Sequence, residues 1–192
     1  MHPTTDHANP NLKQAVSYWL MPDPPTAAAL EQLSHSARQH LNACWLPPHI
    51  TLYSDLLDST NQAIERLITT AHQQHPLWLQ PATIEAGGAF TQSLLLRFQL
   101  EKGEAVAQAA LQAWCQDLRQ RSTDALGYRL DPHLSLVYSN DALPIRQARA
   151  SALMPPTTSL RFDRVGAVSH PLRIQTARDI AAFTTLTIQS LH

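Results

Sequence analysis

Two short stretches of the chain repeat the same order of residue types. Residues 48–52 and 132–136 both run proline, histidine, aliphatic residue, hydroxyl residue, leucine, with His49 and Thr51 in the first copy and His133 and Ser135 in the second. Imidazole is the side chain whose proton moves near neutral pH, and a hydroxyl can donate a hydrogen bond to a phosphoryl oxygen. One histidine that takes a proton from water, and a second that gives a proton to a departing alkoxide, are the minimum machinery for cleaving a phosphoester without a metal.

Each copy lies in a segment with strand composition, and strand geometry gives the spacing its meaning. Side chains alternate along a strand, so residues two apart share a face. His49 therefore projects with Thr51, and His133 projects with Ser135, while the aliphatic residues between them face the other way. Two such strands that meet between two halves of the molecule would bring both imidazoles and both hydroxyls into one cleft.

Hydrophobic periodicity predicts the elements that must position these residues. Strands are expected at residues 15–21, 50–56, 93–100, 134–138 and 157–169, and helices at 26–42, 60–73, 104–121 and 145–153. Hairpins are expected to join 77–85 to 93–100 and 157–169 to 172–177, while residues 181–191 fit a strand or a helix equally well. The order divides into two halves of similar plan, which predicts an α+β fold of two lobes related by an approximate two-fold axis.

Composition excludes several classes of protein. The 192 residues fit one domain, and 44% of them are hydrophobic, which is enough for a sizeable core. The formal net charge is -1, whereas a protein that holds duplex nucleic acid by its phosphates needs a basic face. The chain has only 5 glycines and neither a GxGxxG nor a GxxxxGK[ST] motif, so a glycine-rich phosphate loop is excluded.

The ends of the chain and its cysteines indicate the compartment. No apolar run is long enough to cross a membrane, and the polar first ten residues lack the apolar centre of a secretory signal. We therefore expect a disordered tail at 1–14, one bilobal domain at 15–192, a cytoplasmic location and no membrane partner. Cys44 and Cys115 form no CxxC motif and are expected to be free thiols.

The repeated motifs, together with VSYWLMP at 16–22, PPHITLYSD at 47–55 and DPHLSLVYS at 131–139, carry a family resemblance. The chain resembles the 2H phosphoesterase superfamily, and most of all its cyclic phosphodiesterase branch, over residues 15–177. The resemblance implies a bilobal α+β fold, with antiparallel sheets around a central cleft and helices packed outside. It also implies hydrolysis, without metal or cofactor, of a 2′,3′-cyclic nucleotide or of the cyclic phosphate of ADP-ribose to a phosphomonoester.

The resemblance also implies roles for particular residues. His49 and His133 match the catalytic histidines, and Thr51 and Ser135 match the phosphate-binding hydroxyls. Further ligand contacts are implied for three aromatic residues, Tyr138, Trp19 and Phe90. Strict alternation, however, places Tyr138 on the face opposite His133, so it reaches the cleft only if the strand bulges or ends there.

Other functions remain open on the sequence. An RNA-end enzyme that cleaves or joins 2′-5′ linkages would need a basic track, which six arginines could supply if they cluster: Arg119, Arg121, Arg129, Arg146, Arg149 and Arg164. A nucleotide-binding module without turnover is a second alternative, and metal-dependent hydrolysis is a third. Our leading prediction is a monomeric enzyme for a small nucleotide with a cyclic phosphate, with RNA ends as possible substrates. Arg97 faces either the cleft or solvent.

Overall fold

The sheet of this protein is built from two sets of antiparallel strands. The structure, a computed structural model, describes residues 13–99 and 105–192. Its elements in chain order are β1 (Gln14–Pro22), α1 (Pro24–Arg38), β2 (Ala43–Cys44), β3 (Ile50–Leu56), α2 (Thr60–Ala71), β4 (Leu77–Leu79), β5 (Pro81–Glu85), the 3-10 helix η1 (Phe90–Gln92), β6 (Leu94–Phe98), α3 (Ala105–Gln120), β7 (His133–Ser139), α4 (Leu143–Ser151), β8 (Leu160–Pro171), α5 (Ala177–Ala181) and β9 (Thr184–Ser190).

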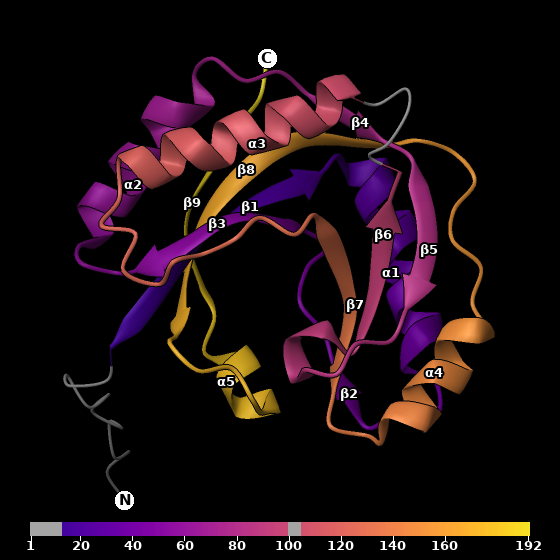
Figure 1. Cartoon of the computed structure of the whole chain (residues 1–192). Helices are drawn as coiled ribbons and strands as arrows, with labels where there is room; N and C mark the ends of the chain where they lie inside the picture. Colours follow the sequence, from indigo (N-terminus) through magenta and orange to yellow (C-terminus); the bar gives the residue numbers. More distant parts are fainter. Residues whose placement is uncertain (1–12, 100–104) are drawn as a thin grey trace, which may run out of the picture.

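The strand order explains how the two motif copies meet. It runs β4-β8-β1-β3-β7-β6-β5, with β9 paired to β8 and β2 paired to β7. The two motif strands β3 and β7 are neighbours, joined by one pair of residues, Ile50 and Leu134, at the centre of the sheet. In Figure 1 the strands β1, β3 and β8 run across the view, whereas β5, β6 and β7 run down it. The inner ends of the two halves therefore come together at the two motifs.

Helices cover the sheet and close the core. Helices α2 and α3 pack on β3, β8 and β9, while α1 packs on β1 and β7 and α4 packs on β5. Figure 1 shows α2 and α3 together along the top of β1, β3 and β8. Fully buried side chains from both halves, among them Tyr18, Leu52, Leu96 and Trp114, belong to one hydrophobic cluster. The predicted α+β class is confirmed, with the two halves sharing this core.

Local signals set the helix ends. Helix α1 begins at Pro24 because the Asp23 carboxylate accepts a hydrogen bond from the Thr26 amide at 2.9 Å, and proline suits the first turn, where no backbone donor is needed. The hydroxyl of Ser59 caps α2 in the same way. The sequence predicts that α1 begins at residue 26, which is two residues later than its observed start at Pro24.

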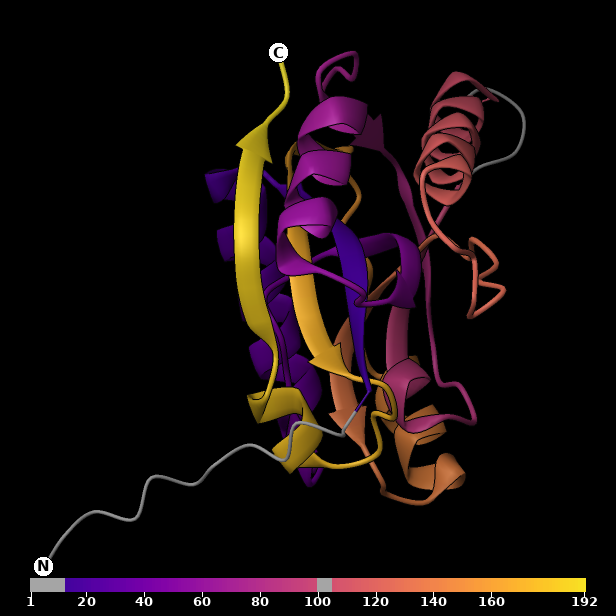
Figure 2. The same cartoon turned by 90° about the vertical axis from the view of Figure 1, so that its left-hand side faces the viewer.

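The C-terminal part of the chain differs from the prediction. Residues 172–177 are not the hairpin partner of β8; the partner is β9, which pairs with β8 from Ser169–Thr184 to Arg164–Ser190. Between them a capping box, in which Thr176 and Asp179 exchange hydrogen bonds, begins helix α5. Figure 2, with the molecule turned by 90°, shows β9 (yellow) running alongside β8. Residues 181–191, which fit a strand or a helix equally well by sequence, thus form mainly a strand.

Other predictions are settled in part. The hairpin between 77–85 and 93–100 exists as β5–β6, but residues 77–79 form β4 and pair with β8 instead. Residues 1–12 of the predicted tail at 1–14 lie outside the described residues. Gln14, at the other end of that predicted tail, already belongs to β1. In the described part of the chain, no helix is both long and apolar enough to cross a membrane.

Candidate active site

A β-bulge interrupts each motif strand at the same motif position. On β3, Trp19 of β1 pairs with Thr51 and Tyr18 pairs with Tyr53, so Leu52 has no partner. On β7, Leu95 of β6 pairs with Ser135 and Leu94 pairs with Val137, so Leu136 has no partner. In both strands the unpaired leucine comes directly after the motif hydroxyl, and the extra residue reverses the alternation beyond it.

The two bulges decide which side chains reach the cleft. Leu136 and Val137 are both fully buried, and Tyr138 turns back to the side of His133 and lines the cavity. The sequence predicts that Tyr138 reaches the cleft only if the strand bulges or ends there, and the bulge at Leu136 meets that condition. On β3 the same shift brings Ser54 to the cavity and sends Tyr53 into the core.

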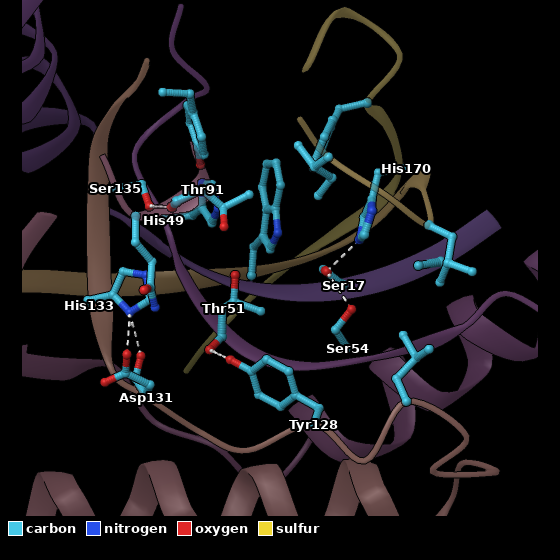
Figure 3. Close-up of a pocket in the computed structure, with 18 of the residues that line it drawn as sticks. Ser17, His49, Thr51, Ser54, Thr91, Tyr128, Asp131, His133, Ser135 and His170 are labelled. Carbon is cyan, nitrogen blue, oxygen red and sulfur yellow. Dashed lines mark hydrogen bonds and ion pairs between the residues drawn. The ribbon is translucent and has the colours of Figure 1, made fainter. Parts of the chain in front are cut away.

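The cavity between the two halves has a volume of about 360 Å³, and side chains of both motifs line it. His49 and Thr51 enter from one half, and His133 and Ser135 enter from the other, as Figure 3 shows. The wall is completed by side chains of β1, of the loop before β7 and of the segment after β8. Within residues 13–99 and 105–192, no three side chains of His, Cys, Asp or Glu lie close enough together to hold a metal ion.

Both histidines are held in the same tautomer. Nδ1 of His49 lies 2.7 Å from the carbonyl oxygen of Pro47, and Nδ1 of His133 lies 2.7 Å from that of Asp131. A carbonyl oxygen can only accept a hydrogen bond, so in each ring Nδ1 carries the proton and donates. When the ring is neutral, Nε2 is left with its lone pair and can take up a proton.

The surroundings of the two histidines differ in charge. Burial, together with charge on His133 and His170, lowers the pKa of His49 to about 4. Burial also lowers the pKa of His133, but the Asp131 carboxylate, 3.3 Å from Nδ1, acts to raise it. His49 is therefore neutral at neutral pH and suited to accept a proton, whereas His133 has a carboxylate that stabilises its protonated form.

The two motif hydroxyls differ in their hydrogen bonding: that of Ser135 has a partner and that of Thr51 has none among the described residues. The backbone carbonyl of Thr51 accepts a hydrogen bond from the Tyr128 hydroxyl at 2.9 Å, whereas its own hydroxyl bonds to nothing in the described part of the chain. The Ser135 hydroxyl donates to the carbonyl of Thr91 at 3.0 Å. Ser135 must rotate to donate to a ligand, while Thr51 can donate without losing a bond.

The three aromatic residues predicted to contact ligand occupy different places. Tyr138 lines the cavity, and burial raises the pKa of its hydroxyl. Trp19 also lines the cavity, but one face of its indole is stacked on His49, with ring centroids 3.6 Å apart and planes at 10°. Phe90 is not among the lining residues: its ring packs against Tyr138 at 6.0 Å, and its neighbours Thr91 and Gln92 face the cavity instead.

Sequence reasoning missed a group of polar side chains at one end of the cavity. Nε2 of His170 lies 2.7 Å from the Ser17 hydroxyl, which is 2.9 Å from the Ser54 hydroxyl. Figure 3 shows this chain of contacts beside Thr51. Ser17 shares the face of Trp19 two residues on, which alternation alone could have shown. His170 had no such signal, because no motif surrounds it.

The orientation of Arg97 is also settled. Its guanidinium pairs with Glu85 at 3.3 Å and with Asp131 at 2.5 Å, and the side chain is not among those that line the cavity. Arg97 therefore acts on the site through Asp131, the residue that contacts His133. The arginine that does line the cavity is Arg129, at its exposed rim.

Comparisons with known structures support the fold. The apo structure of LigT from E. coli matches with a TM-score of 0.55 and 14% identity, over 93% of this chain and 98% of that one. The crystal structure of a phosphoesterase matches with a TM-score of 0.56 and 15% identity, over 93% of this chain and 98% of that one. TT0787 of Thermus thermophilus gives 0.51 and 15%, over 92% of this chain and 97% of its own. At these identities the likeness is one of fold.

Sequence comparison identifies the family. No curated protein matches this chain in sequence. Residues 14–156 match the model of a family described as cyclic phosphodiesterase-like protein, and this span is well over half of the chain and contains both histidine motifs. The chain thus belongs to the cyclic phosphodiesterase-like family of the 2H phosphoesterase superfamily, as its two Pro-His motifs indicated.

Proposed function

We propose that this protein hydrolyses a 2′,3′-cyclic nucleotide, or the cyclic phosphate of ADP-ribose, to a phosphomonoester without a metal ion. The observation that carries the proposal is the paired arrangement of the two motifs. Two imidazoles in the same tautomer, each with a hydroxyl two residues on, face one cavity from opposite halves of the molecule. Cleavage in line needs one proton-transfer group on each side of the phosphorus atom.

The difference between the surroundings of the two histidines supports one distribution of their roles. His49, neutral at neutral pH, takes a proton from water as the water oxygen bonds to phosphorus. The bond from phosphorus to one ribose oxygen breaks, and His133 gives its proton to that oxygen. His49 ends protonated and His133 neutral, and exchange with solvent restores both. A positioned acid or base contributes about 10²–10⁴-fold to such a step.

The hydroxyls and Tyr138 complete the proposed site. Thr51 and Ser135 donate hydrogen bonds to the phosphoryl oxygens that do not react, where negative charge grows in the transition state. Tyr138 bounds the cavity on the side of Ser135 and contacts the ligand there. Trp19 holds the ring of His49 and bounds the ligand with its edge, and Phe90 supports the ring of Tyr138 from behind.

Two observations support a small nucleotide over a long RNA. E. coli LigT has been solved in complex with 3'-AMP, ATP and NADP+, which are all nucleotides. Most of the arginines that could form a basic track here bind their own chain: Arg119 pairs with Asp124, Arg121 with Asp117 and Arg164 with Asp163, and Arg146 and Arg149 donate to backbone carbonyls. Activity on RNA ends that rises steeply with length and falls steeply with salt would contradict this choice.

The decisive experiment compares histidine variants on several cyclic phosphates. The His49→Ala and His133→Ala proteins are incubated with the four 2′,3′-cyclic mononucleotides and with the cyclic phosphate of ADP-ribose, and phosphorus NMR follows the products. Each variant is expected to lose most turnover, about 10²-fold or more, with an unchanged circular dichroism spectrum. The exposed His72 provides a matched control, since His72→Ala leaves the cavity untouched.

Three further results would change the proposal. Near-full activity in either histidine variant on every substrate refutes the assignment of acid and base. Loss of activity with a chelator, restored by a metal ion, favours metal-dependent hydrolysis instead. Binding of nucleotides without any turnover favours the non-catalytic module. A monomer in the cytoplasm, formed as one domain over residues 15–192, stays a prediction.

A further inference from the structure

Four aromatic rings stand in a row along the wall of the cavity. The imidazole of His49 stacks on Trp19 at 3.6 Å and 10°. The indole contacts Phe183 at 5.7 Å and 31°, and Phe183 stacks on His170 at 4.8 Å and 13°. The row therefore connects the residue assigned as the base to a histidine at the other end of the cavity, through residues far apart in the chain.

Hydrogen bonds fix both ends of the row. At one end, Nδ1 of His49 donates to the Pro47 carbonyl. At the other, Nδ1 of His170 lies 2.9 Å from the Pro171 carbonyl and therefore donates to it, while Nε2 lies 2.7 Å from the oxygen of Ser17, which donates its own proton to Ser54. His170 is only 6% exposed. Neither terminal ring can turn without breaking the hydrogen bond that its Nδ1 donates.

The segment that carries Phe183 is itself anchored. Phe183 follows helix α5, whose capping box and buried Ile180 hold it against the sheet. The side-chain amide of Asn140, just after β7, donates to the carbonyl of Gln175 at 3.1 Å and so ties this segment to the other half of the molecule. His170 and Phe183 both lie beyond residue 156, where the family match ends.

We propose that Phe183 and His170 are positioning residues that hold the ring of His49 in its working orientation, acting through Trp19. The inference rests on the proposed role of His49 as the base. The His49 imidazole is fixed in one orientation by the hydrogen bond at Nδ1 and by its stacking on the parallel indole of Trp19, which also covers one face of the ring against water. Proton transfer depends on such placement, and an error of about 1 Å at the reacting atoms can reduce the rate about 10²-fold.

The test replaces Phe183 by leucine, which keeps an apolar side chain but removes the aromatic ring that contacts Trp19. The expected result is a kcat about tenfold lower with KM changed less than about twofold. In the protein without ligand, the pKa of His49 is expected to rise from about 4 toward its ordinary value, because water reaches the ring. NMR titration of the ring carbons measures this directly.

Three companion variants keep the test sharp. Phe183→Tyr restores an aromatic ring and should restore both kcat and the pKa of His49. Phe90→Leu makes the same substitution beside Tyr138 in the other half, and should leave the pKa of His49 unchanged. If Phe183→Leu does not fold, Ser17→Ala still removes one of the two contacts that hold His170 at the end of the row, and it should also raise the pKa of His49.

The two proposals fail in different ways. The charged groups that act on His49 are His133 and His170, and both remain in every variant. Titration of all three histidines in the same NMR experiment separates a changed environment of the His49 ring from a changed charge on a neighbouring histidine. Absence of turnover in the unaltered protein would refute the proposed function, yet the titration would still test the row of rings. An unchanged His49 titration in both Phe183→Leu and Ser17→Ala overturns the positioning role.

Discussion

In the proposed mechanism the carboxylate of Asp131 makes His133 the acid, and the Asp131→Asn substitution tests that role. An asparagine side chain has nearly the same size, and the backbone carbonyl that accepts from His133 Nδ1 stays in place. The carboxylate oxygen lies 3.3 Å from Nδ1, and the Asp131 side chain is 47% exposed. The His133 side chain is only 17% exposed, so the dielectric constant of water gives the smallest attraction, about 1.3 kcal/mol for two unit charges at that separation.

That energy sets the expected change in rate. About 1.3 kcal/mol corresponds to about one pKa unit, and removal of the carboxylate lowers the pKa of His133 because the imidazolium loses a stabilising charge. A general acid must be protonated to act, so activity is lost as pH rises through its pKa. The Asp131→Asn substitution should therefore move the alkaline limb of the pH–rate profile to lower pH by about one unit, with kcat about tenfold lower on that limb.

The assay is a pH–rate profile on a cyclic mononucleotide, joined to NMR titration of His133. Arg97→Gln supplies the opposite perturbation, because the Arg97 charge lowers the pKa of His133, so its loss should move the same limb to higher pH. Asp117→Asn on α3 removes a comparable ion pair far from the histidines and should leave the profile unchanged. If Asp131→Asn shifts only the acid limb, the roles of the two histidines are exchanged.

Three further predictions follow from the same contacts. Thr51→Val and Ser135→Ala should each reduce kcat/KM by about ten- to a hundredfold in steady-state kinetics, the cost of losing a hydrogen bond to a charged group; unchanged values would exclude phosphate contact. Burial keeps His49 neutral in the folded protein, whereas His49 in the unfolded chain binds a proton below its ordinary pKa. The free energy of unfolding should therefore fall by about 3 kcal/mol as pH drops from about 6.5 to 4. Urea titrations of His49→Gln should lack that part of the loss. Asp55→Asn should lower the free energy of unfolding by about 1–3 kcal/mol, since this fully buried carboxylate accepts two hydrogen bonds from the loop before β7, and an unchanged urea midpoint would contradict it.

The sequence is sufficient to place the side chains of the motifs because their arrangement depends on local spacing. A histidine and a hydroxyl two residues apart on a strand share a face whatever the strand pairs with. The place of Tyr138 cannot be obtained in this way, because the bulge at Leu136 is a property of the pairing between β6 and β7. Alternation therefore places the residues up to the bulge correctly and the residues beyond it incorrectly.

The end of the chain shows the same limit on a larger scale. Nearness to β8 predicts a hairpin partner at residues 172–177, although the Thr176 and Asp179 pattern that starts a helix is visible in the sequence. The stacking of Trp19, Phe183 and His170 depends on β1 and β8 being neighbours. No local pattern reports that neighbourhood, so the sequence carries no signal for the third histidine of the cavity.

The two motif copies differ at one informative position, two residues before the histidine. Pro47 and Asp131 offer the same backbone carbonyl to Nδ1, so both histidines take the same tautomer. Only Asp131 adds a carboxylate, and it acts on His133 alone. Because a duplicated site has equivalent geometry in both halves, acid and base must be distinguished by charge or by burial. Here both differences point the same way: the buried His49 stacked on Trp19 stays neutral, and the half-buried His133 beside Asp131 holds its proton more readily.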